Sequence, residues 1–225
     1  MTSQLVVWSR RFTLFLLATS LLWAGESWQK KPFTEWDFFE VDEILSDSPW
    51  AQPLIVGAAS ARMGLLRGQQ GAVDHGLERG VPGGIMVVRW FSAVTLREAC
   101  VRSNQLAEVI LEERAQQLLA WQPEYYVVGV GLLSVGSDPF WAPVEQPLPE
   151  PGKVFLELAS SKRRIAPVKH QRLGTTEWYF FPREEEGQPL LASEKKVKFS
   201  TWLDNQLRSV TFDLRKMTRE GKPDL

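Results

Sequence analysis

A capped, amphipathic segment at residues 32–51 constrains the fold more than any other stretch of this 225-residue chain. Thr34 is placed to cap a helix, and Asp37 three residues later is placed to reach back in a capping-box arrangement. Pro49 disfavours the helical conformation at the residue before it, so the helix is predicted to end there. Helical spacing puts four apolar residues on one side: Phe38, Val41, Ile44 and Leu45. The segment therefore predicts a helix that packs one side against the rest of the protein.

The acidic side of this predicted helix is the candidate binding surface. It carries Glu40 and Glu43, and Trp36 and Phe39 lie nearer to it than to the apolar side. In one interpretation, Trp36, Phe39, Glu40 and Glu43 form a surface that docks a partner. In the other, the helix belongs to the core and a sheet of the same chain covers the two aromatic side chains, which is the commoner arrangement.

The first 27 residues are predicted to be a secretory signal. Arg10 and Arg11 precede an apolar run from Phe12 to Trp23, and small residues follow the run. The run is shorter than the roughly 20 residues that a membrane-spanning helix needs. Because the cleavage site is poorly defined, an uncleaved signal anchor stays open as an alternative. We therefore expect an exported protein that is periplasmic or anchored to the inner membrane.

The remaining residues, 28–225, are predicted to form a single α+β domain. The pattern between two of its predicted strands indicates one long helix at 95–121, with Thr95 and Glu98 as its capping box. Strand, helix and strand in this order predict a βαβ unit with a right-handed crossover. Apolar runs of strand length occur at 53–58, 84–91 and 125–133.

The second half of the chain is predicted to be mainly β-sheet, built from antiparallel hairpins. Glycine-rich residues 60–83 predict a flexible loop before it, and proline-rich residues 134–152 predict a semi-rigid connector. The last hairpin is predicted to pair residues 196–203 with residues 207–216. Its buried face is predicted to carry Val210, Phe212 and Leu214.

Few side chains in the sequence are suited to catalysis. Cys100 lies on the apolar side of a predicted helix, His75 lies in the glycine-rich loop and His170 lies in a predicted edge strand. No metal-ligand spacing and no phosphate-binding glycine motif occurs, so the sequence predicts no metal site and no cofactor. A hydrolase that acts on an envelope polymer through two carboxylates is the alternative, with Glu40 and Glu43 as the candidate pair.

Charge is distributed unevenly along the chain. Acidic residues outnumber basic ones by seven to two over residues 26–52, whereas basic residues predominate over 153–222, and the net charge is only -1. We expect the two regions to complement each other within one molecule, and we expect no nucleic-acid partner.

Several short motifs resemble those of an uncharacterised family of exported bacterial proteins, many of them lipoproteins. Among them are Pro32-Phe33-Thr34-x-Trp36, Ser48-Pro49-Trp50-Ala51, Arg89-Trp90-x-Ser92-Ala93, Phe180-Phe181-Pro182-Arg183 and the late Lys216-Met217 with Gly221-Lys222. The resemblance implies no activity and no catalytic residues, and the lipid-attachment cysteine is absent here. The sequence as a whole predicts a non-catalytic cell-envelope protein that binds or scaffolds an envelope protein or polymer.

Overall fold

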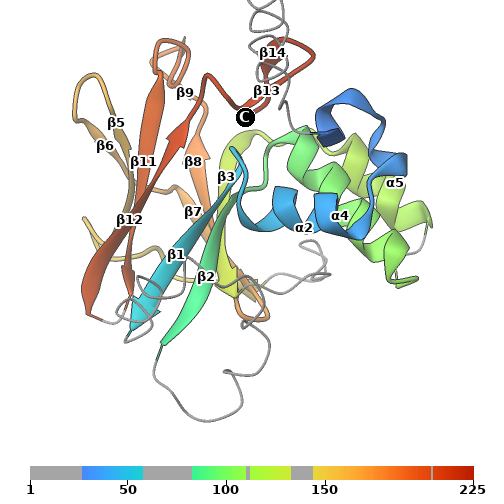
Figure 1. The fold of residues 1–225 in the computed structure, drawn as a ribbon. Coiled ribbons are helices and arrows are strands. Elements are labelled where there is room, and N and C mark those ends of the chain that lie inside the picture. Colours follow the sequence, from blue (N-terminus) through green and yellow to red (C-terminus); the bar gives the residue numbers. More distant parts are fainter. Residues whose placement is uncertain (1–26, 58–82, 110–111, 133–143, 204) are drawn as a thin grey trace, which may run out of the picture.

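The computed structural model describes residues 27–57, 83–109, 112–132, 144–203 and 205–225, and it confirms a mixed α+β fold that is mainly β (Figure 1). Two short 3-10 turns precede three α-helices in the described residues. These helical elements are η2 (Ser27–Lys30), η3 (Phe33–Glu35), α2 (Phe38–Ser46), α4 (Val94–Leu106) and α5 (Glu112–Ala120).

Two antiparallel sheets make up most of the molecule. The larger has the order β1-β2-β3-β8-β7-β4 and the smaller has the order β12-β11-β5-β6. The larger sheet consists of β1 (Ala51–Gly57), β2 (Gly83–Trp90), β3 (Tyr125–Leu132), β8 (Thr176–Pro182), β7 (Lys169–Leu173) and β4 (Val144–Glu145). The smaller sheet consists of β12 (Gln206–Asp213), β11 (Lys196–Leu203), β5 (Val154–Leu158) and β6 (Arg164–Ile165). Two short ribbons pair β9 (Glu184–Glu185) with β10 (Gln188–Pro189), and β13 (Thr218–Arg219) with β14 (Lys222–Pro223).

Aromatic side chains between the two sheets form the centre of the core. Trp90 of β2 packs edge-on against Phe212 of β12 with the ring centroids 5.2 Å apart, and Phe181 of β8 meets Phe199 of β11 at 6.3 Å. All four side chains are buried. Because successive residues of a strand point to opposite faces, the residues that flank Trp90 point away from the smaller sheet.

The three α-helices lie together on the other side of the larger sheet (Figure 1). Arg89 of β2 donates from Nε to the carbonyl oxygen of Leu45 in α2, at 2.7 Å. Phe91, just after β2, stacks on Trp178 of β8 with the ring centroids 4.6 Å apart. A Cβ atom at Gly129 of β3 would lie 2.4 Å from a carbon of the Phe91 ring, so only glycine leaves room for that ring.

The predicted βαβ unit with one long helix is wrong. Two helices, α4 and α5, stand in place of the long helix, and Glu108 between them has a left-handed φ of 57° that ends the first. A pair of packed helices returns the chain to the end of the sheet that it left. The next strand therefore runs antiparallel, and Trp90 of β2 pairs with Val128 of β3 in that sense.

The predicted N-terminus of the first helix is also wrong. Residues Phe33–Glu35 form the separate turn η3, and Asp37 is the N-cap of α2. The side chain of Asp37 accepts from the backbone N–H of Glu40, while the Glu40 carboxylate accepts from the backbone N–H of Asp37, both at 2.9 Å. The capping box thus exists three residues later than predicted, and Thr34 does not belong to it.

The predicted strands at 53–58, 84–91 and 125–133 and the last hairpin are confirmed by β1, β2, β3 and the β11–β12 pair. Val210, Phe212 and Leu214 are buried, and so is Cys100. The predicted signal, the glycine-rich loop and the first part of the proline-rich connector fall outside the described residues, save for their borders. No helix within the described ranges is long and apolar enough to cross a membrane.

Candidate binding sites

Trp36, the first residue of the predicted binding surface, is part of the protein's own packing. Its side chain is 4% exposed, and its indole N–H donates to the carbonyl oxygen of Trp28 at 2.9 Å. The two indole rings meet edge-on with their centroids 5.9 Å apart. Arg102 of α4 donates from Nε to the Trp36 carbonyl at 2.8 Å. Trp36 therefore joins the start of the described chain to α4.

Glu40 is likewise committed to internal contacts. Besides its place in the capping box of α2, its carboxylate lies 2.6 Å from the ammonium group of Lys31. The residue is 8% exposed. A carboxylate pair formed by Glu40 and Glu43 would have to break the α2 cap to reach a substrate.

Phe39 and Glu43, the other two predicted residues, are both exposed, and Phe39 shows 81% of its surface. Phe38 beside it is 56% exposed, although helical spacing had predicted it on the apolar side. The two phenylalanine rings meet edge-on at 6.0 Å. We call the first turns of this helix, with Phe38, Phe39, Asp42 and Glu43, together with Glu35 of η3 just before it, the acidic-aromatic end of α2.

Only negative charge surrounds this pair of rings in the local sequence. The chain from Phe33 to Asp47 contains no lysine or arginine. The exposed phenylalanines therefore neighbour the exposed residues Glu35 and Glu43 and the half-buried Asp42 in the sequence, an arrangement that a basic surface would complement.

A cleft of 490 Å³ opens on the other side of Trp36, between the start of the described chain and the β13–β14 ribbon. Its lining includes the buried residues Trp28, Trp36 and Glu98. The complete lining consists of residues 28–33, Trp36, Thr95, Glu98 and residues 218–221.

Glu98 and Arg219 form the charged centre of this cleft. The Arg219 guanidinium donates from Nη2 to Oε1 of Glu98 at 2.7 Å. Burial raises the pKa of the Glu98 carboxyl, and Arg219 opposes that rise. The second oxygen of Glu98, Oε2, has no hydrogen-bond partner among the described residues, nor do Nε and Nη1 of Arg219.

The predicted capping role of Glu98 is wrong, which is why it is available in the cleft. Ala93 is the N-cap of α4 and makes no side-chain bond. The Asp224 carboxylate instead accepts from the backbone N–H groups of Val94 at 2.6 Å and Thr95 at 3.0 Å. No local pattern predicts this cap, because its donor and acceptor lie about 130 positions apart.

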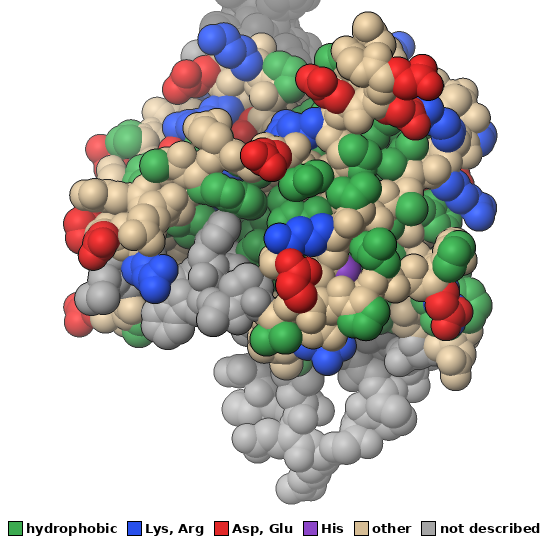
Figure 2. Space-filling model, turned by 180° about the vertical axis from the view of Figure 1, so that it is seen from behind, with side chains coloured by type: hydrophobic (Ala, Val, Ile, Leu, Met, Phe, Trp, Pro, Cys, Tyr) green, Lys and Arg blue, Asp and Glu red, His purple; other side chains and the backbone are tan. Residues whose placement is uncertain are grey.

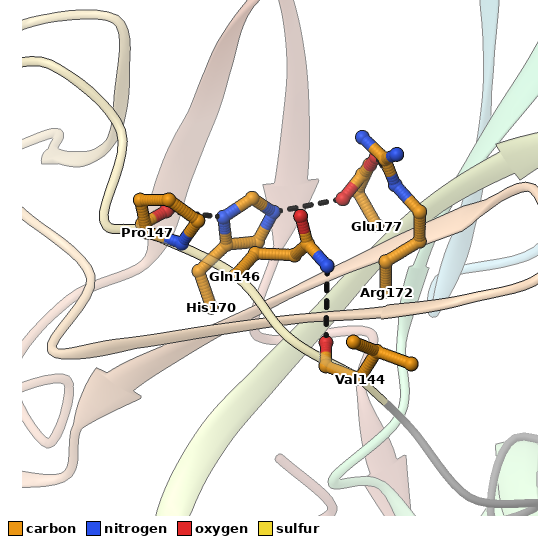
Figure 3. A network of polar contacts seen from close by, with 6 residues as sticks. All are labelled: Val144, Gln146, Pro147, His170, Arg172 and Glu177. Carbon is orange, nitrogen blue, oxygen red and sulfur yellow. Dashed lines mark hydrogen bonds and ion pairs between the residues drawn. The ribbon is translucent and has the colours of Figure 1, made fainter.

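His170 forms a separate polar network on β7 (Figure 3). Its Nδ1 donates to the carbonyl oxygen of Pro147 and its Nε2 lies against the Glu177 carboxylate, each at 2.8 Å. Arg172 donates to the other oxygen of Glu177, and the His170 ring stacks on Tyr179 at 4.7 Å. Both ring nitrogens of His170 are thus engaged within the fold. The network therefore fastens the connector onto the sheet.

Figure 2 shows a small area of histidine surface on the face opposite to that of Figure 1. The His170 side chain is 12% exposed. Hydrophobic side chains gather towards the middle of that face (Figure 2). Over the described ranges no three His, Cys, Asp or Glu residues are grouped closely enough to hold a metal ion.

Comparison with protein-family models, with curated proteins and with solved structures found no match to this chain. Its function is therefore argued from the geometry of the acidic-aromatic end of α2 and of the cleft.

Proposed function

We propose that this chain is a non-catalytic cell-envelope protein that binds a protein partner through the acidic-aromatic end of α2. The observation that carries the proposal is the exposure of two adjacent phenylalanines, Phe38 and Phe39, on a well-capped helix. Placement in the envelope rests on the signal-like residues 1–27, which are still a prediction.

Burial of these rings is the energetic reason to expect a partner. Covering a phenylalanine side chain fully yields about 1.5–3 kcal/mol, and with Phe39 81% and Phe38 56% exposed, much of that gain is not realised within the described part of the fold. Aromatic anchors that enter a pocket commonly supply most of the binding energy of an interface. The carboxylates around them add long-range attraction to a basic partner and repel an acidic one.

The partner is therefore expected to present an apolar pocket rimmed by lysine or arginine. Glu35, Asp42 and Glu43 would meet that rim, and Phe39 would enter the pocket deepest because it is the more exposed ring. Such a rim predicts a complex that weakens as salt concentration rises.

A second candidate function is hydrolysis of an envelope polymer, and one observation favours it. Burial raises the pKa of Glu98 in the cleft, as a general acid requires, and the charges of Asp224 and Glu220 add to the rise. Against this, Arg219 holds the Glu98 carboxylate in an ion pair. Binding therefore ranks first.

Affinity capture followed by reconstitution tests the proposed function. Tagged full-length protein would be incubated with envelope extract from the source cells, and each captured protein would be purified and tested for direct binding. We expect a basic partner whose binding is lost in the Phe38→Ala/Phe39→Ala variant and weakens with added salt. Binding that persists in this variant, or a partner without a basic surface, would overturn the proposal.

The matched control replaces exposed apolar side chains on a different face. Trp202 and Leu207 face each other across β11 and β12 and are 45% and 43% exposed. The Trp202→Ala/Leu207→Ala variant removes a similar apolar area and should bind the partner as the wild type does.

A further inference from the structure

We propose that the cleft between residues 28–33 and the β13–β14 ribbon binds a neutral saccharide. This site is separate from the acidic-aromatic end of α2 and does not depend on the function proposed for it. Its volume of 490 Å³ lies within the range of sites for small ligands.

Side-chain atoms in the cleft that make no hydrogen bond within the described residues are suited to a ligand that both donates and accepts hydrogen bonds. Oε2 of Glu98 accepts only, whereas Nε and Nη1 of Arg219 donate only, and none of the three has a partner among the described residues. The Glu98–Arg219 ion pair fixes these two sets of atoms beside each other. Adjacent hydroxyl groups of a sugar satisfy both sets at once, because each hydroxyl donates one bond and accepts others.

Charge balance around the cleft argues against a charged ligand. Lys30, Lys31 and Arg219 line it together with Glu98 and Glu220, and Lys31 is in turn paired with Glu40 behind the wall. Of these lining side chains three are positive and two are negative, and Glu40, which is not part of the lining, compensates Lys31. A phosphate or a free carboxylate would add a charge that the site does not compensate, and it would compete with the existing ion pair.

Phe33 supplies the apolar contact that a sugar ring needs. It is partly buried on the rim of the cleft, and its ring meets that of Trp36 edge-on at 6.2 Å. The exposed part of Phe33 is an apolar surface for the C–H groups of a pyranose, whose hydroxyl groups would bind Glu98 and Arg219 of the same lining. An apolar ring in the same lining as a paired carboxylate and guanidinium is suited to a ligand ring with polar edges.

Titration calorimetry with purified saccharides tests this site. The probes are neutral hexose and N-acetylhexosamine oligomers, with uronic-acid and phosphorylated oligomers as charged comparisons. We expect saturable binding of at least one neutral probe that is insensitive to salt. Arg219→Ala and Glu98→Gln should each weaken it by about tenfold or more, because each removes a hydrogen bond to a charged group.

Arg215→Ala is the matched control, since Arg215 is an exposed arginine near the same ribbon that pairs with Asp213 instead. It should leave saccharide binding unchanged. Failure of every neutral probe to bind, binding of charged probes alone, or equal affinity in all three variants would overturn the assignment.

Product analysis of the same mixtures separates this inference from the proposed function. Cleavage of a bound oligomer that Glu98→Gln abolishes would support the cleft as a saccharide site and overturn the non-catalytic function. Loss of partner capture in the Phe38→Ala/Phe39→Ala variant with normal saccharide binding would support both proposals.

Discussion

Tyr179 shows at the scale of one residue how the two sheets shape side-chain chemistry. Its ring lies between the His170 ring at 4.7 Å and the Phe199 ring at 6.0 Å. Burial raises the pKa of the Tyr179 phenol to about 12, and the neighbouring Glu177 carboxylate adds to the rise. The phenol is thus held neutral well beyond the pH at which an exposed tyrosine ionises.

This raised pKa predicts a loss of stability in alkali. An unfolded tyrosine loses its proton near pH 10, so the stabilisation from Tyr179 is complete below about pH 10 and is lost as the pH rises towards 12. The two-unit difference corresponds to about 2.7 kcal/mol as an upper bound. Urea unfolding at a series of pH values should show a shallower decline for Tyr179→Phe than for wild type, and identical slopes would contradict the prediction.

At the scale of one element, α2 shows which part of its sequence signal holds. The apolar stripe correctly predicts burial of Val41, Ile44 and Leu45. The capping pattern is ambiguous, because Thr34 with Asp37 and Asp37 with Glu40 both have the required three-residue spacing. Only the capping box of Asp37 with Glu40 is formed, because Thr34 belongs to the separate turn η3.

Paired substitutions should separate the two caps. Asp37→Ala removes the capping-box acceptor and should cost about 1 kcal/mol of unfolding free energy. Thr34→Ala, on an exposed residue whose side chain caps nothing, should change it by less than about 0.5 kcal/mol. Urea titrations of the two variants measure this difference. A loss of unfolding free energy for Thr34→Ala that equals or exceeds the loss for Asp37→Ala would support the cap predicted from sequence instead.

A feature of the fold can be predicted from the sequence when the residues that determine it lie close together in the chain. Strands with strong apolar runs and the alternation of the last hairpin are local, and they were predicted correctly. The break at Glu108 carries no glycine or proline, so one continuous helix was the natural prediction. The cleft was not predictable, because Glu98 and Arg219 meet across 121 positions of the chain.

In the whole molecule, the segment at 222–225 joins the helices to the larger sheet. Asp224 caps α4, and its carbonyl oxygen accepts from the indole N–H of Trp50 beside β1, at 2.8 Å. Arg183, which follows β8, donates to the carbonyl oxygen of Leu225 at 2.8 Å. Helices and larger sheet are therefore tied through the same few residues.

Asp224→Ala should accordingly destabilise the whole fold. It leaves two N–H groups at the start of α4 without their acceptor, one of them on the buried residue Thr95, and should cost about 1–2 kcal/mol of unfolding free energy. Asp213→Ala is the control, because Asp213 pairs with the exposed Arg215 and should matter little. Equal unfolding midpoints for Asp224→Ala and wild type would show that the contacts of this segment do not stabilise the fold.

The most direct test of the proposed function is the dissociation constant of the reconstituted partner complex, measured for wild type and Phe39→Ala with the unfolding free energy of the same samples. Phe39 is 81% exposed, so its removal should leave stability within about 0.5 kcal/mol of wild type. Binding should weaken by tenfold or more, as for an interface anchor. Unchanged affinity, or a loss of stability large enough to explain weaker binding, would contradict a docking role for the acidic-aromatic end of α2.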